Sequence, residues 1–227
     1  MAPPVTEIVE FALPSSADVA AVFPDACKTL TQQPGCRAAR YSVQHEDASK
    51  LVLYVDWDSI SAHEAFAANA DVYKPFLGHM LTFHNAADAG PLSAYHVAFD
   101  PPAKDVLDVA PAVEVLHLHF PVDYDLESEQ ETVRTISEFL AIARGAAGAG
   151  EGGMDLLVGP QAVGWAVEER VWKEEKVRVL VVMVGWRSVE AHMKYRDTDA
   201  FRESIGMIRG LKGMKGINVY HVACAKA

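Results

Sequence analysis

Residues 57–66 read WDSISAHEAF and residues 186–195 read WRSVEAHMKY, so the chain carries the same motif twice. A Trp, a Ser, an Ala, a His and an aromatic side chain recur in the same order. Both copies follow an apolar run, and both halves later contain Tyr-His-Val. The first segments agree as well, because the stretch from Glu7 aligns with the stretch from Glu114. A repeat longer than the roughly 20–50 residues of a solenoid unit indicates a duplicated domain.

Each half shows the pattern strand, helix, strand, strand, helix, strand. In the first half, apolar periodicity predicts strands over 5–13, 37–45, 50–57 and 92–99, a helix over 17–33, and a helix or broken helix over 60–85. The second half predicts strands over 112–121, 162–171, 177–186 and 216–224, with helices over 127–144 and 189–209. We expect Ser15 and Ser16 to cap the first helix and Ser59 the second, because serine hydroxyls accept from the amides of a helix start. This βαββαβ order is the ferredoxin-like topology.

The predicted fold class is therefore α+β, with two ferredoxin-like βαββαβ repeats. Helices cover one face of such a sheet, and the other face must be buried elsewhere. A second copy can bury it, so we expect an intramolecular dimeric α+β barrel. Prolines at 101, 102 and 111 cannot continue a strand ladder. The predicted domains are therefore 1–99 and 112–227, joined by a linker over 100–111.

A stretch rich in glycine and alanine, residues 144–153, is an insertion in the second repeat. It has no periodicity, which is typical of a flexible segment. Two interpretations stay open: a tolerated surface insertion, which we favour, and a mobile lid over a pocket.

The composition limits the partners and the location of the protein. The formal net charge is -11, which argues against nucleic acid and against an anionic membrane surface. The chain has 3 cysteines without a zinc-ligand spacing, which fits a reducing, cytoplasmic setting. The first residues lack the basic and apolar regions of a signal peptide. The apolar runs are too short to cross a bilayer.

The βαββαβ order, with Trp-x-Ser-x-x-Ala-His at the start of the second helix, resembles the antibiotic-biosynthesis monooxygenase family of dimeric α+β barrels. The resemblance covers most of both halves. Related proteins include cofactor-free oxygenases of secondary metabolism that act on polyketide aromatic rings, haem-degrading enzymes, isomerases, and stress or ligand-binding proteins. Single-domain members pair two chains, so the resemblance implies a monomeric pseudo-dimer or a homodimer here.

The resemblance also bears on cofactors. The haem-degrading members use a histidine late in the second helix and an asparagine on the first strand. The matching helix positions here, 73–76 and 202–205, hold no histidine, and the first strands offer Glu10 and His117 in place of asparagine. We therefore expect no cofactor, and haem and metal are both disfavoured.

A histidine pair on the first strand of the second repeat is the strongest local candidate for chemistry. Side chains alternate between the two faces of a strand. Leu116, Leu118 and Phe120 form an apolar face suited to the helices. His117 and His119 are therefore expected to point to the opposite face, between the two halves.

The repeat loses its symmetry at these histidines, because the matching positions of the first half hold Glu10 and Ala12. A histidine titrates near neutral pH and can act as a general base. Two histidines at i and i+2 can also bind a metal, and a third interpretation makes them ordinary polar residues. We take His117, His119 and Glu10 as candidate catalytic residues and predict no metal site.

Aromatic side chains at or near strand ends are candidate contacts for an aromatic small-molecule ligand: Trp57, Trp186, Tyr41 and Trp165. Trp57 and Trp186 end the third strands. Such a side chain either lines a ligand pocket or seals the core, and its duplication favours the core. We expect His63 and His192, one helical turn after the serine caps, to be structural.

Two functions follow as hypotheses. The first is a cofactor-independent monooxygenase, or a related isomerase or cyclase, acting on a small aromatic or polyketide-like molecule. Its histidine base makes a carbanion or phenolate that reacts with oxygen. The second is a non-catalytic protein that binds a small molecule or responds to stress. The sequence contains no nucleophile elbow, P-loop or dinucleotide fingerprint.

Overall fold

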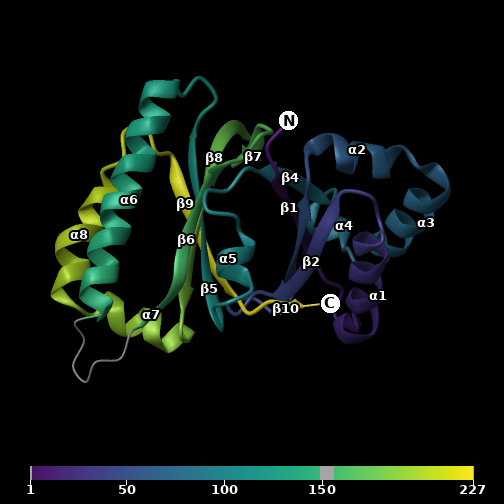
Figure 1. Cartoon of the computed structure of the whole chain (residues 1–227), viewed down its shortest axis with the longest axis horizontal. Coiled ribbons are helices and arrows are strands. Elements are labelled where there is room, and N and C mark those ends of the chain that lie inside the picture. Colours follow the sequence, from purple (N-terminus) through teal and green to yellow (C-terminus); the bar gives the residue numbers. More distant parts are fainter. Residues whose placement is uncertain (1, 149–155, 227) are drawn as a thin grey trace. The chain divides into compact units, whose positions relative to one another are not determined.

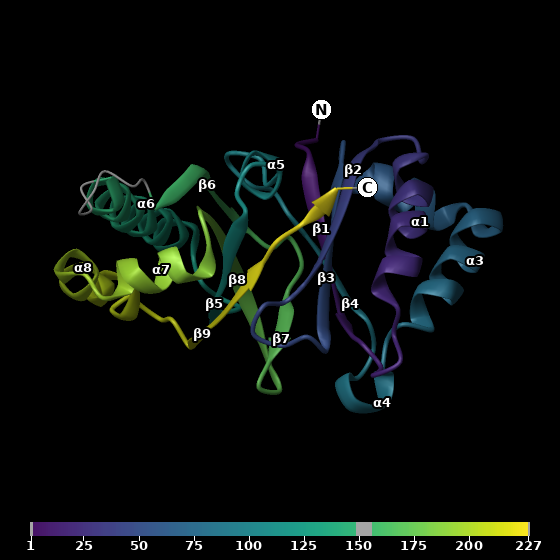
Figure 2. The same cartoon turned by 90° about the horizontal axis from the view of Figure 1, so that it is seen from below.

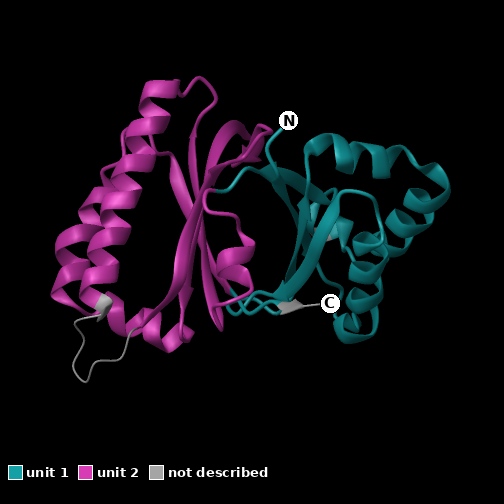
Figure 3. Cartoon of the chain, viewed as in Figure 1, with its two compact units in different colours: residues 1–99, 222–227 teal, residues 100–221 magenta. Residues whose placement is uncertain are grey.

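The computed structural model describes residues 2–148 and 156–226, which form two compact units (Figure 1). Unit 1 comprises residues 1–99 and 222–227, and unit 2 comprises residues 100–221. Each unit contains one antiparallel sheet with helices packed on it (Figure 2, Figure 3).

Unit 1 follows the predicted order. Its elements are β1 (Val5–Ala12), α1 (Val19–Thr31), β2 (Cys36–Val43), β3 (Lys50–Trp57), α2 (Ile60–Ala68), α3 (Ala70–Leu81), α4 (Ala86–Ala89) and β4 (Ser93–Val97). The strand order is β2-β3-β1-β4, and β10 (Ala225–Lys226) from the end of the chain adds to the free edge of β2. Strand β1 is therefore central, with β3 and β4 on either side of it.

Unit 2 repeats this arrangement. Its elements are β5 (Ala112–Pro121), α6 (Leu126–Gly148), β6 (Leu157–Trp165), β7 (Arg170–Trp172), β8 (Glu175–Trp186), α7 (Val189–Arg196), α8 (Asp199–Arg209) and β9 (Gly216–Val222). The strand order is β6-β8-β5-β9, and the short β7 pairs with β8. The equal strand orders confirm the α+β class and the duplicated ferredoxin-like fold. The assembly of the two sheets into one barrel stays a prediction.

Helix caps follow the prediction in both copies of the motif but not in α1. Ser59 and Ser188 each accept a hydrogen bond at 3.2 Å from the amide three residues on. The first helix instead begins at Asp18, whose carboxylate accepts from the amide three residues on at 3.1 Å. The prediction of a cap at Ser15 and Ser16 is therefore wrong, because the stronger acceptor lies further along the chain.

Residues 100–111, which the prolines mark as a linker, contain the short helix α5 (Lys104–Leu107). The segment belongs to unit 2, where Asp100 forms a backbone bridge to β6 and α5 lies on the face of the sheet opposite α6 (Figure 1). Gly185 permits this close packing, because a Cβ there would come within 2.7 Å of the Cβ of Ala110.

The insertion is helical in its first part, because α6 continues to Gly148. Residues 149–155, on which the choice between a surface insertion and a lid depends, lie outside the described residues. In the part of the chain that the structure describes, no helix is both long enough and apolar enough to cross a bilayer.

Each unit has its own core between the sheet and the helices. In unit 1 the core includes Val9 and Phe11 of β1, so the odd-numbered residues of this strand face the helices. In unit 2 it includes Leu118 and Phe120 of β5, so there the even-numbered residues face the helices. The predicted helix-facing side of β5 is therefore the observed one.

Candidate functional site

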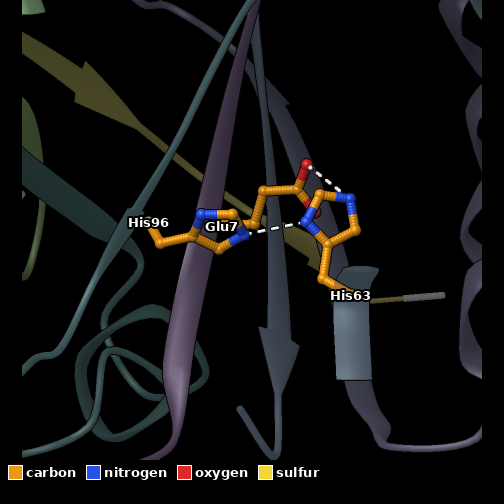
Figure 4. Close-up of side chains that lie close together, drawn as sticks. All are labelled: Glu7, His63 and His96. Carbon is orange, nitrogen blue, oxygen red and sulfur yellow. Dashed lines mark hydrogen bonds and ion pairs between the residues drawn. The ribbon is translucent and has the colours of Figure 1, made fainter. Parts of the chain in front are cut away.

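A polar cluster lies within the apolar core of unit 1, on the face of the sheet that the helices cover. We call it quartet 1; its members are Glu7, Trp57, His63 and His96. Glu7 lies on β1 and pairs in register with His96 on β4, so both side chains share one face. Trp57 ends β3, and His63 lies in the first turn of α2. Figure 4 shows that the ring nitrogens of His63 contact both His96 and Glu7.

His63 is held from three directions. Its Nδ1 shares a hydrogen bond of 2.8 Å with Nε2 of His96. Its Nε2 lies 3.5 Å from Oε1 of Glu7, and its ring stacks on Trp57 with centroids 5.2 Å apart. The indole of Trp57 donates to Oε2 of Glu7 at 2.9 Å. The imidazole therefore has a defined orientation, with one nitrogen toward a carboxylate and the other toward a second imidazole.

Unit 2 contains the same cluster, which we call quartet 2: Glu114, Trp186, His192 and His221. The indole donates to Glu114 at 3.1 Å, and the two histidines share a hydrogen bond of 2.8 Å. The ring of His192 stacks on Trp186 with centroids 4.7 Å apart. The repeated Trp-Ser-His motif thus supplies the Trp and one His of each quartet, and the other two recurring segments supply the Glu and the second His.

The two quartets differ in how the carboxylate is used. In quartet 1, Trp57 contacts Oε2 and His63 lies nearest Oε1. In quartet 2 both the indole and His192, at 3.6 Å, point to Oε2 of Glu114. The side chain of His63 is 17% exposed, against 6% for His192. His63 is therefore the more accessible of the two helix histidines.

A cavity of about 70 Å³ in unit 1 explains this difference. It lies between the sheet and helices α2 and α3, and a cavity of this size holds at least one water molecule. Glu7 and His63 form part of its wall. Its other lining side chains are mostly apolar and include Phe66, Tyr73, Phe76 and Met80. Burial, and next the charge of Glu7, raise the pKa of Tyr73, so its hydroxyl stays protonated at neutral pH.

His117 and His119 of unit 2 lie outside both quartets, on the predicted face of β5, and both are buried. His117 packs against Tyr220, and His119 stacks on Trp172 with centroids 4.7 Å apart. Burial, followed by the charge of Arg170, lowers the pKa of His117 to about 4. Burial, with His117 as the next cause, also lowers the pKa of His119 to about 4. Both rings are therefore uncharged at neutral pH.

Glu10, the third predicted catalytic residue, lies on β1 of unit 1. It is an even-numbered residue of that strand, so it faces away from the helices and from quartet 1. It is partly exposed and pairs in register with Val52 and Ser93. The catalytic role of Glu10, His117 and His119 stays a prediction.

The four predicted ligand contacts all lie in helix-side cores. Trp57 and Trp186 are almost fully buried. Tyr41 packs against Phe23 at 5.3 Å between centroids, and Trp165 packs against Phe120 at the same distance. The residues that line the unit 1 cavity do not include Trp57 or Tyr41. These side chains act as core residues, and their contact with a ligand stays a prediction.

Four site residues were not identified from the sequence: Glu7, His96, Glu114 and His221. His63 and His192 were expected to have a structural role only. The signal that identifies them is the repeat, since every member of quartet 1 has a counterpart of the same type in quartet 2.

Comparison with known families gives a match in the first half of the chain. Residues 10–85 match the family model of the antibiotic biosynthesis monooxygenase, abbreviated ABM. The match begins near the end of β1, at residue 10, and runs past α3 to residue 85. It includes His63 and most of the cavity lining, whereas Glu7 and His96 lie outside it. Unit 2 shares the fold and the quartet arrangement of unit 1. A comparison with curated proteins found no match.

Solved structures share the fold along the whole chain. An anthrone oxidase-like protein has a TM-score of 0.64 and 12% identity, covering 99% of this chain and 94% of its own. A candidate monooxygenase from Lactobacillus acidophilus has a TM-score of 0.58 and 12% identity, covering 99% and 96%. A candidate monooxygenase from Fusobacterium nucleatum has a TM-score of 0.56 and 10% identity, covering 98% and 93%. At this identity the likeness concerns the fold, and it extends over both repeats.

Proposed function

We propose that unit 1 is a cofactor-independent monooxygenase for a small, mostly apolar aromatic molecule, with His63 as the general base. The observation that carries the proposal is the cavity whose apolar wall is interrupted by Glu7 and His63. The ABM match over the same helices supports it. An apolar lining with a few placed polar groups is the usual composition of a small-molecule site. The cavity of about 70 Å³ is smaller than an aromatic substrate, so binding requires α2 and α3 to move away from the sheet.

The geometry suits proton abstraction. Nε2 of His63 takes a proton from an acidic CH₂ group or a phenol of the substrate, while the bond from Nδ1 to His96 holds the ring in place. The imidazolium that forms lies beside the carboxylate of Glu7, 3.5 Å away, which stabilises its charge. The apolar lining excludes water from the reacting carbon.

Dioxygen is the oxidant. The carbanion gives up electrons to dioxygen and forms a bond to one oxygen atom, and the resulting peroxide loses water. A CH₂ group and O₂ thus become a ketone and H₂O, so the substrate itself supplies the electrons. The anthrone oxidase-like protein, whose name refers to a ketone with such a CH₂ group, is consistent with this chemistry.

His117 and His119 are the alternative bases. Their buried positions lower both pKa values to about 4, so each is a much weaker proton acceptor than an ordinary histidine. For this reason we assign the base to His63 and use the pair as the matched comparison.

The test separates proton abstraction from oxidation. Wild-type protein is incubated without oxygen in D₂O with 2-indanone or anthrone, and loss of the CH₂ signal is followed by NMR; oxygen uptake is measured separately. We expect faster exchange with wild type and with H117A/H119A, and loss of the acceleration with H63A. If H117A/H119A loses the acceleration of exchange and H63A retains it, the general base is His117 or His119 of unit 2. Saturable binding of both ketones with no exchange or oxygen uptake would favour the non-catalytic binding protein.

A further inference from the structure

A second chemistry is available to the same side chains. Glu7, His63 and His96 each offer a metal-ligating atom, and these atoms all lie within 4.8 Å of one another (Figure 4). Zinc binds histidine nitrogen and carboxylate oxygen at about 2.0–2.2 Å, so two ligands of one ion stand up to about 4 Å apart. Small side-chain rotations therefore suffice to bring all three atoms onto one ion.

We propose that Glu7, His63 and His96 form a binding site for a divalent transition-metal ion, and that the bound ion excludes the proton transfer proposed for His63. The metal site stands on the geometry alone, and only the exclusion of proton transfer rests on the proposed function. The ligand set of two imidazoles and one carboxylate suits Zn²⁺, Co²⁺, Ni²⁺ or Fe²⁺, whereas Mg²⁺ and Ca²⁺ prefer oxygen ligands alone.

The surroundings support an ion in quartet 1. Trp57 donates to Oε2 of Glu7, and the atom nearest His63 is Oε1. Metal-ligating carboxylates are usually oriented by such a second hydrogen bond. Glu7 and His63 also line the cavity, which leaves room for water or another ligand in the remaining coordination positions.

Quartet 2 is the natural control. Glu114 presents the same oxygen to Trp186 and to His192, and His192 is buried more deeply than His63. Within the described residues, the 4.8 Å spacing is met by the group in quartet 1 and not by its counterpart.

The binding experiment uses full-length protein without a histidine tag, stripped with EDTA. Co²⁺ is added while the visible absorption of the coordinated ion is recorded, and Zn²⁺ is then used to displace it. We expect saturation at one Co²⁺ per chain. The dissociation constant should rise at least tenfold in H96A and E7Q, and stay within about twofold of wild type in H221A. E7Q preserves side-chain volume, so it stands in if H96A does not fold. Absence of saturable Co²⁺ absorption in wild type, or equal losses in H96A and H221A, would overturn the site.

Inhibition of proton transfer by the bound ion is measured separately. Saturating Zn²⁺ should abolish the anaerobic exchange of 2-indanone protons, and EDTA should restore it. Exchange that continues at full rate with Zn²⁺ bound, or is accelerated by it, would overturn the exclusion. Stoichiometric Co²⁺ binding by a protein that shows no exchange at all leaves the metal site standing and refutes the proposed oxygenase instead.

Discussion

Quartet 1 and quartet 2 contain the same four residue types on matching elements, and two members of quartet 1, Glu7 and His63, border the unit 1 cavity. Both quartets have the indole-to-carboxylate bond and the bond between histidines. The side chain of His192 is only 6% exposed. One oxygen of Glu114, Oε2, accepts from Trp186 and also lies nearest His192. The comparison teaches that the same four residue types hold the same arrangement in both units, and that in unit 1 a cavity borders it. We propose a reactive role for the quartet that the cavity reaches.

The largest effect expected from this comparison is on turnover, when the carboxylate of quartet 1 loses its charge. Gln at position 7 can still accept from Trp57 but no longer stabilises an imidazolium at His63. We expect E7Q to lower the rate of proton exchange by about 100-fold, in the range seen for general-base groups. E114Q, which makes the same change in unit 2, should stay within about threefold. Equal losses in the two variants would remove the functional distinction between the quartets.

The units should also differ in how their stability depends on pH, and we expect unit 2 to lose stability in acid. Burial lowers the pKa of His117 from 6.5 to about 4. Below pH 6.5 the unfolded chain takes up a proton that the folded chain refuses, so stability falls as the pH drops toward 4. At 1.36 kcal/mol per pKa unit, the full loss from His117 once the pH is well below 4 is about 3 kcal/mol.

Urea unfolding between pH 7 and pH 4.5 measures this loss. In H117L, whose side chain has no proton to bind, the decline between these pH values should be smaller by roughly 2 kcal/mol. A decline as steep in H117L as in wild type would show that His117 is not held in its neutral form.

We expect the larger loss of stability from a change in quartet 2, whereas the larger loss of turnover is expected from a change in quartet 1. Removing His192 takes one partner each from Glu114 and His221 in a closed core, which costs roughly 2 kcal/mol. Removing His63 leaves groups beside a cavity that water can enter, so H63A should cost roughly 1 kcal/mol. Thermal unfolding of H63A and H192A checks this order, and a lower melting temperature for H63A would reverse the assignment.

The smallest expected effect is that of filling the cavity. Ala94 lines it from β4, beside His96. We expect A94L to weaken binding of 2-indanone about tenfold while the unfolding free energy changes by less than about 1 kcal/mol, since the added carbons occupy existing space. Ligand binding followed by tryptophan fluorescence tests this. Unchanged affinity in a folded A94L protein would place the ligand elsewhere.

The fold could be predicted from the sequence because period-two and helical patterns are local, and because each pattern occurs twice. The main error in a boundary lies at β6, which begins at Leu157 and not at 162. Gly159 has a positive φ of 70° there, and the register of β6 shifts between Leu157 and Gln161. A glycine followed by a proline concealed the first part of the strand.

The site could be predicted only in part. Sequence reasoning searched for residues close together on one strand, and so selected His117 and His119. The members of quartet 1 come from separate elements: Trp57 lies 50 residues from Glu7, and His96 lies 33 residues from His63. Strand pairing brings them together, and no local spacing reveals that. The repeated histidines were visible, but their bond to each other required the sheet order.

The central claim is that the same histidine is reactive in one unit and structural in the other. Anaerobic exchange of the CH₂ protons of 2-indanone in D₂O, measured for H63A and H192A at a temperature where both are folded, tests it most directly. The account predicts a loss of at least about 100-fold in H63A, with H192A within about threefold of wild type. Exchange that survives in H63A, or that falls equally in both variants, would contradict it.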